Sequence, residues 1–258
     1  MSKTSPVALL ACTLALLAPA LSRAEPAVLG LARAYLGPES TLEGIKSIHF
    51  VGTVQRADPD SKTPPVSVGL DMIFAKPLKQ RLVITGPMAS RTTVLDGYDA
   101  WDLVRETADP SKFRLNWLNA ADIKTLRANT WENLYYYRAP EGGTVEDKGP
   151  ATIDGVQCER IDITHTPEIL YVRYFDRDTG RLVMTLKGAE QIRESGEILA
   201  DGVRFAKTIV STTKSASGKD VLTTVSFVSV TLNEDLPPGI FTVPSTPAPK
   251  PAAAAAGK

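Results

Sequence analysis

Apolar and polar residues alternate along most of this chain, which predicts a protein built mainly from β-strands. Residues 48–55 and 66–74 show the pattern most clearly, because side chains two positions apart point to the same face of a strand. The residues that share one face are Ile48, Phe50, Gly52 and Val54 in the first segment, and Val66, Val68, Leu70, Met72 and Phe74 in the second.

Asp-Gly pairs at 96–97, 154–155 and 201–202 separate several of the alternating segments. These residues tolerate the positive φ angles of two-residue hairpin loops, and such loops join antiparallel neighbours. The pattern predicts an antiparallel meander of about ten or eleven strands, and a sheet of that length tends to curl. No fixed repeat length is present, so we expect hairpins rather than a repeat protein.

Two segments have helical spacing instead. Residues 26–36 predict a short amphipathic helix that ends before Gly37-Pro38. Asn119 is a candidate N-cap, with Asp122 three residues later. The apolar positions of this second predicted helix are Ile123, Leu126, Thr130, Trp131 and Leu134.

Residues 1–24 have the composition of a secretory signal peptide. Lys3 precedes an apolar run from Val7 to Leu21, which is shorter than the roughly 20 residues of a membrane-spanning helix. We expect cleavage after Ala24 and a soluble, exported protein. A second interpretation is lipidation of Cys12, since Leu9–Cys12 loosely resembles a bacterial lipobox.

The remaining chain is close to neutral. The full sequence has 29 basic and 29 acidic residues, and loss of Lys3 and Arg23 leaves 27 against 29. This balance gives no electrostatic reason to expect nucleic acid as a partner. Cys158 is then the single cysteine, so we expect no internal disulfide. Residues 25–243 predict one domain, and the Pro/Ala-rich residues 244–258 predict a disordered tail.

Candidate catalytic groups are few and scattered. Cys158 and His165 are seven residues apart along one predicted strand, on opposite faces and roughly 20 Å from each other. We interpret His49 as a solvated strand residue and His165 as a loop residue. The Ser-x-x-Lys pattern at 211–214 ends a strand, whereas its acyl-enzyme counterpart needs a helix. We therefore expect no enzyme, no metal site and no cofactor.

The apolar side chains on the concave face of a curled sheet must be shielded from water. One possibility is an ordinary core beneath the two helices. The other is a hydrophobic cavity that accepts a guest, with the helices as a lid. The residue pattern alone leaves both open.

Several weak motifs, taken in order, resemble the periplasmic lipoprotein carriers, the LolA/LolB-like or outer-membrane lipoprotein-sorting proteins. The likeness covers roughly residues 27–244. The motifs are Phe74-x-Lys76-Pro77, a following strand with Arg81, Asp96-Gly97-x-x-x-Trp101, a hairpin from Asp176 to Leu182, and the closing segment 236–244.

This resemblance implies an unclosed half-barrel, a single curved antiparallel sheet with two or three helices over its concave face. It implies a monomer that shields the acyl chains of a lipoprotein or similar lipid, with an inner-membrane donor and an outer-membrane receptor as partners. The residues expected to line the cavity are Phe50, Val54, Leu70, Met72, Phe74 and Trp101 on the sheet, and Ile123, Leu126, Trp131 and Leu134 on the helix.

Carriers of this family often have Arg before the proline, where it bonds to the lid. Lys76 occupies that position here, and a lysine cannot make the same forked contacts as an arginine. The two candidates for a latch to the lid are Lys76 and Arg81. An alternative function on the same fold is a sensor of envelope stress that binds a lipid or a partner protein. A lipid-anchored receptor is a further alternative if Cys12 is lipidated.

Overall fold

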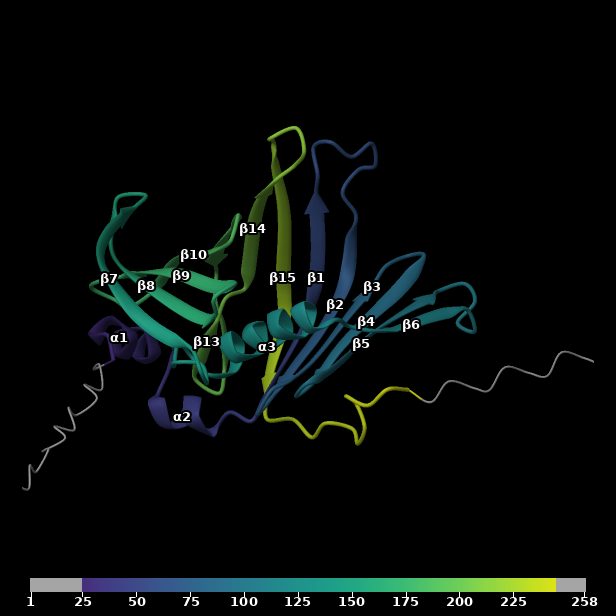
Figure 1. Ribbon diagram of the computed structural model, residues 1–258, viewed down its shortest axis with the longest axis horizontal. Helices are drawn as coiled ribbons and strands as arrows, with labels where there is room; N and C mark the ends of the chain where they lie inside the picture. Colours follow the sequence, from purple (N-terminus) through teal and green to yellow (C-terminus); the bar gives the residue numbers. More distant parts are fainter. Residues whose placement is uncertain (1–24, 245–258) are drawn as a thin grey trace, which may run out of the picture.

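A computed structural model describes residues 25–244 of the chain (Figure 1). The predicted signal peptide, Cys12 within it, and the predicted tail from residue 245 onward lie outside the described residues.

One large antiparallel sheet dominates these residues. Its thirteen strands lie in the order β6-β5-β4-β3-β2-β1-β15-β14-β11-β10-β9-β8-β7, and its two ends do not meet. The predicted unclosed antiparallel sheet is therefore confirmed. The strands are β1 Ser47–Ala57, β2 Ser67–Ala75, β3 Lys79–Thr85, β4 Ala89–Asp96, β5 Asp99–Glu106, β6 Phe113–Trp117, β7 Thr144–Ile153, β8 Val156–Thr166, β9 Ile169–Asp176, β10 Leu182–Lys187, β11 Glu190–Ser195, β14 Thr208–Lys214 and β15 Asp220–Leu232.

Two short strands, β12 (Ile198–Ala200) and β13 (Val203–Phe205), form a separate hairpin. They bring the described chain to fifteen strands, more than the sequence pattern predicted. The difference arises partly because the alternation near 190–198 and 203–213 predicts one strand each. In the structure, each of these segments is divided between the sheet and the hairpin.

The first and last strands join the two halves of the sheet. β1 pairs with β2 on one side and with β15 on the other. Hairpins then extend outward from this centre, to β6 at one end and β7 at the other. The pairing at the centre of the sheet thus joins residues up to 184 positions apart, as Ile48 is opposite Leu232.

Three helices accompany the sheet in the described residues: α1 Ala27–Leu36, α2 Glu39–Gly44 and α3 Ala120–Leu134. The predicted N-cap of α3 is confirmed, because the Asn119 side chain accepts from the backbone N–H groups of Ala121 and Asp122. α3 lies across β2, β3 and β4, whereas α1 and α2 lie toward the β7 end (Figure 1). α2, which the sequence pattern did not predict, follows Pro38 directly.

Two apolar clusters fill the face that the helices cover. One joins β1, β2 and β15 to Leu42 of α2 and Leu134 of α3. The other packs Leu29 and Ala32 of α1 against β8 and β9. Phe74 and Phe175 are the largest of the fully buried side chains, and each cluster contains one of them.

A third cluster covers the opposite face of the sheet. There the closing segment, residues 236–243, packs against Ile73, Val94 and Trp101. The indole Nε1 of Trp101 donates to the carbonyl of Phe241 at 3.4 Å. This segment is not a strand but a run of turns, so it covers the sheet without extending it.

Candidate functional site

A cavity of about 280 Å³ lies between α3 and the inner face of the sheet. Its volume is at the lower end of small-molecule sites, which measure about 300–1,000 Å³. The residues that line it are Leu36, Phe50, Met72, Phe74, Asn129, Glu132, Asn133, Tyr136, Tyr137, Tyr171, Arg173, Thr185, Ile192, Glu194, Arg204, Phe205, Ala206, Ile209 and Phe227.

One side of the cavity is apolar. We call it the apolar wall, formed by Phe50, Met72, Phe74, Phe205, Ile209 and Phe227. Phe50 lies at its centre, with ring centroids at 6.2 Å from Phe74, 5.6 Å from Phe205 and 4.8 Å from Phe227. The strands place these side chains together because Phe50 is opposite Met72 in the β1–β2 register.

The structure brings only some of the predicted lining residues to this cavity. Phe50, Met72 and Phe74 line it. Leu70 and Leu134 belong to the adjoining buried cluster. Val54 is half-buried further along β1, beyond the residues that line the cavity.

The prediction that Trp101 lines the cavity is wrong. Trp101 is opposite Val94, Val94 opposite Arg81, and Arg81 opposite Ile73, so all four share the face that the closing segment covers. Both faces of these strands are covered, and a buried aromatic residue is therefore no guide to which face is inner.

The prediction for α3 is also wrong in its orientation. Trp131 stacks on Tyr135 with ring centroids 3.8 Å apart, and its Nε1 donates to the carbonyl of Arg138 at 3.0 Å. Ile123 and Leu126 are half-buried and lie outside the cavity. The residues that α3 and its C-terminal end present to the cavity follow at i, i+3, i+4 and i+7, and they are Asn129, Glu132, Asn133 and Tyr136.

This polar stripe of α3 faces a second polar surface on the sheet. We call the combined surface the polar wall, formed by Glu132, Tyr136, Tyr137, Tyr171, Arg173, Thr185 and Glu194. Arg173 and Glu132 form an ion pair of 2.6 Å with both side chains at least 90% buried. The Arg173 guanidinium also lies over the ring of Tyr137, 4.8 Å from its centroid.

The two histidines have partners that the sequence pattern did not indicate. His165 belongs to β8 rather than to a loop, and its Nε2 lies 2.7 Å from Oε1 of Glu132, with only 8% of the side chain exposed. His49, predicted to be solvated, lies between Asp71 at 3.0 Å and Glu234 at 2.7 Å on the opposite face of the sheet.

Burial shapes the ionisation of the polar wall. It raises the pKa of Tyr137 and of Tyr171, so both phenols keep their protons. Burial is the largest single influence on Arg173 and works against its charge, but Glu132 together with Tyr137, Glu194 and Tyr171 outweighs it, so the pKa of Arg173 is raised. Glu194 has accessible surface along the cavity, yet the surrounding protein desolvates it and raises its pKa, with Arg173 acting in the opposite direction.

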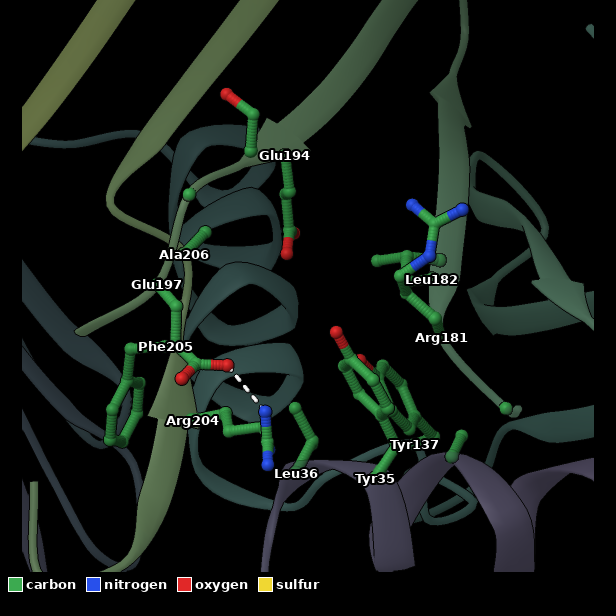
Figure 2. Close-up of a pocket in the computed structure, with 14 residues that line it drawn as sticks. Tyr35, Leu36, Tyr137, Arg181, Leu182, Glu194, Glu197, Arg204, Phe205 and Ala206 are labelled. Carbon is green, nitrogen blue, oxygen red and sulfur yellow. Dashed lines mark hydrogen bonds and ion pairs between the residues drawn. The ribbon is translucent and has the colours of Figure 1, made fainter. Parts of the chain in front are cut away.

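A smaller pocket of about 140 Å³ adjoins the cavity beside α1 (Figure 2). The two share six lining residues, which are Leu36, Tyr137, Glu194, Arg204, Phe205 and Ala206. Arg204 forms an ion pair of 2.5 Å with Glu197, and its guanidinium lies 5.4 Å from the ring centroid of Tyr35. The shared lining places this pocket directly beside the cavity.

Of the two latch candidates, one contacts the helices. Lys76 donates from Nζ to the carbonyl of Glu43 in α2 at 3.3 Å, and Nζ lies 5.5 Å from the ring centroid of Tyr135 at the end of α3. Arg81 instead binds Asp71 at 3.1 Å on the face away from α3, so the prediction of Arg81 as a latch is wrong.

Within residues 25–244, no group of three or more His, Cys, Asp or Glu side chains is placed to hold a metal ion. Burial raises the pKa of the Cys158 thiol, which is fully enclosed in the described structure. No helix in this part of the chain is both long and apolar enough to cross a membrane.

No family model matches the sequence, and no curated protein is significantly similar to it. Solved structures do match. A LolA superfamily protein from Nitrosomonas europaea superposes with a TM-score of 0.58 at 13% identity, over 84% of this chain and 96% of the other. An outer membrane lipoprotein-sorting protein domain from Vibrio parahaemolyticus gives 0.55 at 10% identity, over 83% and 95%.

A DUF1329 family protein from Desulfovibrio piger gives a TM-score of 0.53 at 11% identity, over 83% of this chain and 95% of the other. At such low identity, these similarities establish the fold alone. The resemblance seen in the sequence is thereby confirmed at that level: this chain has the LolA-like fold, an open antiparallel sheet with helices on its inner face.

Proposed function

We propose that this protein is a periplasmic binding protein that shields the acyl chains of a lipoprotein, or of a similar lipid, in the cavity beneath α3. The observation that carries the proposal is the apolar wall, where four phenylalanine rings converge on a cavity that adjoins a second pocket beside α1. Lipoprotein sorting is named for one of the solved structures of the same fold, which supports a similar role here.

The energetics suit a carrier. Each buried methylene contributes about 0.8 kcal/mol, so a single long acyl chain supplies roughly 10 kcal/mol of gross binding energy. A carrier must also release its cargo. Moving α3 to admit a chain costs free energy, and that cost lowers the net affinity.

Apart from the buried ion pairs of Glu132, the polar contacts between α3 and the sheet suit a helix that moves. Asn129 and Thr130 donate to the Gln80 side chain at 3.2 and 3.1 Å, and Arg127 donates to the Gly97 carbonyl at 2.7 Å. Water can replace such partners when the helix moves, and a typical hydrogen bond contributes only about 0.5–1.5 kcal/mol net. We therefore assign α3 the role of a lid, with Lys76 linking its C-terminal end to α2.

Binding of the neutral fluorescent probe N-phenyl-1-naphthylamine tests the cavity. Ile209→Trp fills space on the apolar wall from a half-buried position, and we expect it to weaken probe binding at least tenfold. Val228→Trp, at a β15 position that is 79% exposed, is the matched control. Equal binding by the wild type and both variants would remove the cavity from the proposal.

Cargo and location need separate measurements. Native mass spectrometry of protein purified from the periplasm should reveal bound acylated material. Mass analysis of the mature N-terminus should show cleavage after Ala24, whereas a diacylglyceryl group on Cys12 would identify an anchored receptor instead.

A further inference from the structure

We propose that the polar wall binds the carbonyl oxygen at the head of an acyl chain, so that the preferred ligand is an uncharged acyl ester rather than a free fatty acid. This inference rests on the proposed function and names the chemistry of its ligand. Three polar atoms carry it: Nε of Arg173 and the hydroxyls of Tyr171 and Tyr136.

These three atoms are buried without a hydrogen-bond partner, as is Oε2 of Glu132, whose counterion at 2.6 Å is Arg173 itself. Their residues are 8%, 4% and 7% exposed, respectively, and all three line the cavity. Buried polar groups are nearly always paired, because an unpaired one loses the hydrogen bonds that it makes to water in the unfolded chain. Three such atoms around one cavity therefore indicate a ligand that supplies the missing partners.

All three atoms are hydrogen-bond donors. Guanidinium nitrogens only donate. Burial raises the pKa of Tyr136 and of Tyr171, so each hydroxyl stays protonated and can donate a hydrogen bond. The complementary ligand group is an acceptor, and a carbonyl oxygen with two lone pairs is the acceptor that an acyl chain carries.

The charges around the cavity favour an acceptor without net charge. Arg173 is already paired with Glu132, and Arg204 with Glu197. Glu194 adds an acidic side chain on the same lining. A fatty-acid carboxylate would lie close to the acidic side chains of Glu132 and Glu194, and it would lose its own hydration as well.

The placement of the two walls orients such a ligand. Tyr171 and Arg173 come from β9, while Phe50, Met72 and Phe227 come from β1, β2 and β15, nearer the centre of the sheet. An ester at β9 therefore directs its hydrocarbon chain across the cavity onto the apolar wall.

Competition against bound N-phenyl-1-naphthylamine tests the inference with three ligands of equal chain length: monomyristoylglycerol, the tetradecyl ether of glycerol, and myristate. The ester and the ether differ in the carbonyl group. We expect the ester to displace the probe at the lowest concentration. Tyr171→Phe should raise that concentration about three- to tenfold, the effect of one hydrogen bond, and leave the ether unchanged.

Tyr98→Phe is the matched control, because Tyr98 is 76% exposed and lies outside the cavity lining. Tyr171→Phe keeps the ring that packs against His165, so the ligand-free variant should melt no lower than the wild type. A lower melting temperature would show that the hydroxyl has a partner in the free protein and would overturn the inference.

Two other outcomes overturn it. One is equal competition by the ester and the ether in the wild type, and the other is displacement by myristate at a lower concentration than the ester. In both cases the probe still binds, and the proposed apolar cavity stands. Failure of the probe to bind overturns the proposed function and this inference together.

Discussion

Glu132 on α3 and Arg173 on β9 meet across the cavity, with Oε2 of the carboxylate 2.6 Å from Nη2 of the guanidinium. His165 contacts the second carboxylate oxygen at 2.7 Å. The pair links the helix that covers the sheet to the strand beneath it. The buried ion pair stabilises the position of α3 over the cavity, and it does so only while both charged residues are present.

Glu132→Gln should therefore be strongly destabilising. It leaves the buried Arg173 charge without its counterion, and removal of one partner of a buried pair costs about 3–5 kcal/mol. Urea unfolding followed by circular dichroism measures the loss. Asp220→Asn breaks the exposed pair with Lys214 and should cost less than about 1 kcal/mol. Similar losses in the two variants would contradict this account of the buried pair.

Gly180 in the β9–β10 hairpin should not tolerate a side chain. Its φ is +74°, and a Cβ there would lie 2.3 Å from the backbone carbon of Leu31 in α1. Gly188, in the next hairpin, has φ +58° and open space around it. We expect Gly188→Ala to cost about 1 kcal/mol and Gly180→Ala clearly more, because the second change also displaces α1.

Thermal melts of the two glycine variants provide the comparison. Proteolysis near the N-terminus gives a second readout, since displacement of α1 exposes its backbone. If both alanine variants melt at the same temperature, close packing of α1 on this hairpin is not important for stability.

Removal of the closing segment should expose Trp101 without affecting the cavity. Truncation after Asp235 deletes Phe241, whose carbonyl accepts from the Trp101 indole, and uncovers Ile73. We expect a red shift of tryptophan emission and unchanged binding of N-phenyl-1-naphthylamine. Truncation after Pro244 keeps the contacts of Trp101 and should leave both signals as they are. Loss of probe binding in the shorter form would place Trp101 in the binding site after all.

Cys158 should be inert in the folded protein. Its side chain is fully buried, and burial raises the pKa of the thiol, so the reactive thiolate is both inaccessible and disfavoured. In a chain that begins at Glu25, a chromogenic disulfide reagent at pH 8 should react only after denaturation. Val228→Cys supplies an exposed thiol as the positive control. Rapid labelling of native Cys158 would mean that β8 opens readily.

The meander was predictable because its turns are local. Asp154 and Gly155 both have positive φ angles, and so do Asp201 and Gly202, as two-residue hairpin loops require. A turn of this kind depends on two adjacent residues, and the alternating strands beside it then pair in the only available register. The N-cap of α3 is local for the same reason, since Asn119 binds backbone groups two and three residues ahead.

The polar wall depends on residues that no local pattern connects. Glu132 and Arg173 are 41 positions apart and meet only because α3 is folded back over the sheet. One signal was present: Asn129, Glu132, Asn133 and Tyr136 form a polar stripe at helical spacing. That signal points away from the sheet, because a helix over a sheet is expected to turn its apolar side inward. Trp101 was misplaced because alternation assigns residues to a common face without identifying which face is inner.

The two ends of the sheet, β6 and β7, each have a single neighbour. In a closed barrel, the strand number and the shear together set the diameter. The open sheet of this protein has no such fixed circumference. Small changes of twist between adjacent strands widen or narrow the enclosure while every ladder hydrogen bond stays intact. On the proposed function, a wider ligand would be accommodated by elastic bending of the sheet rather than by the breaking of strand pairs.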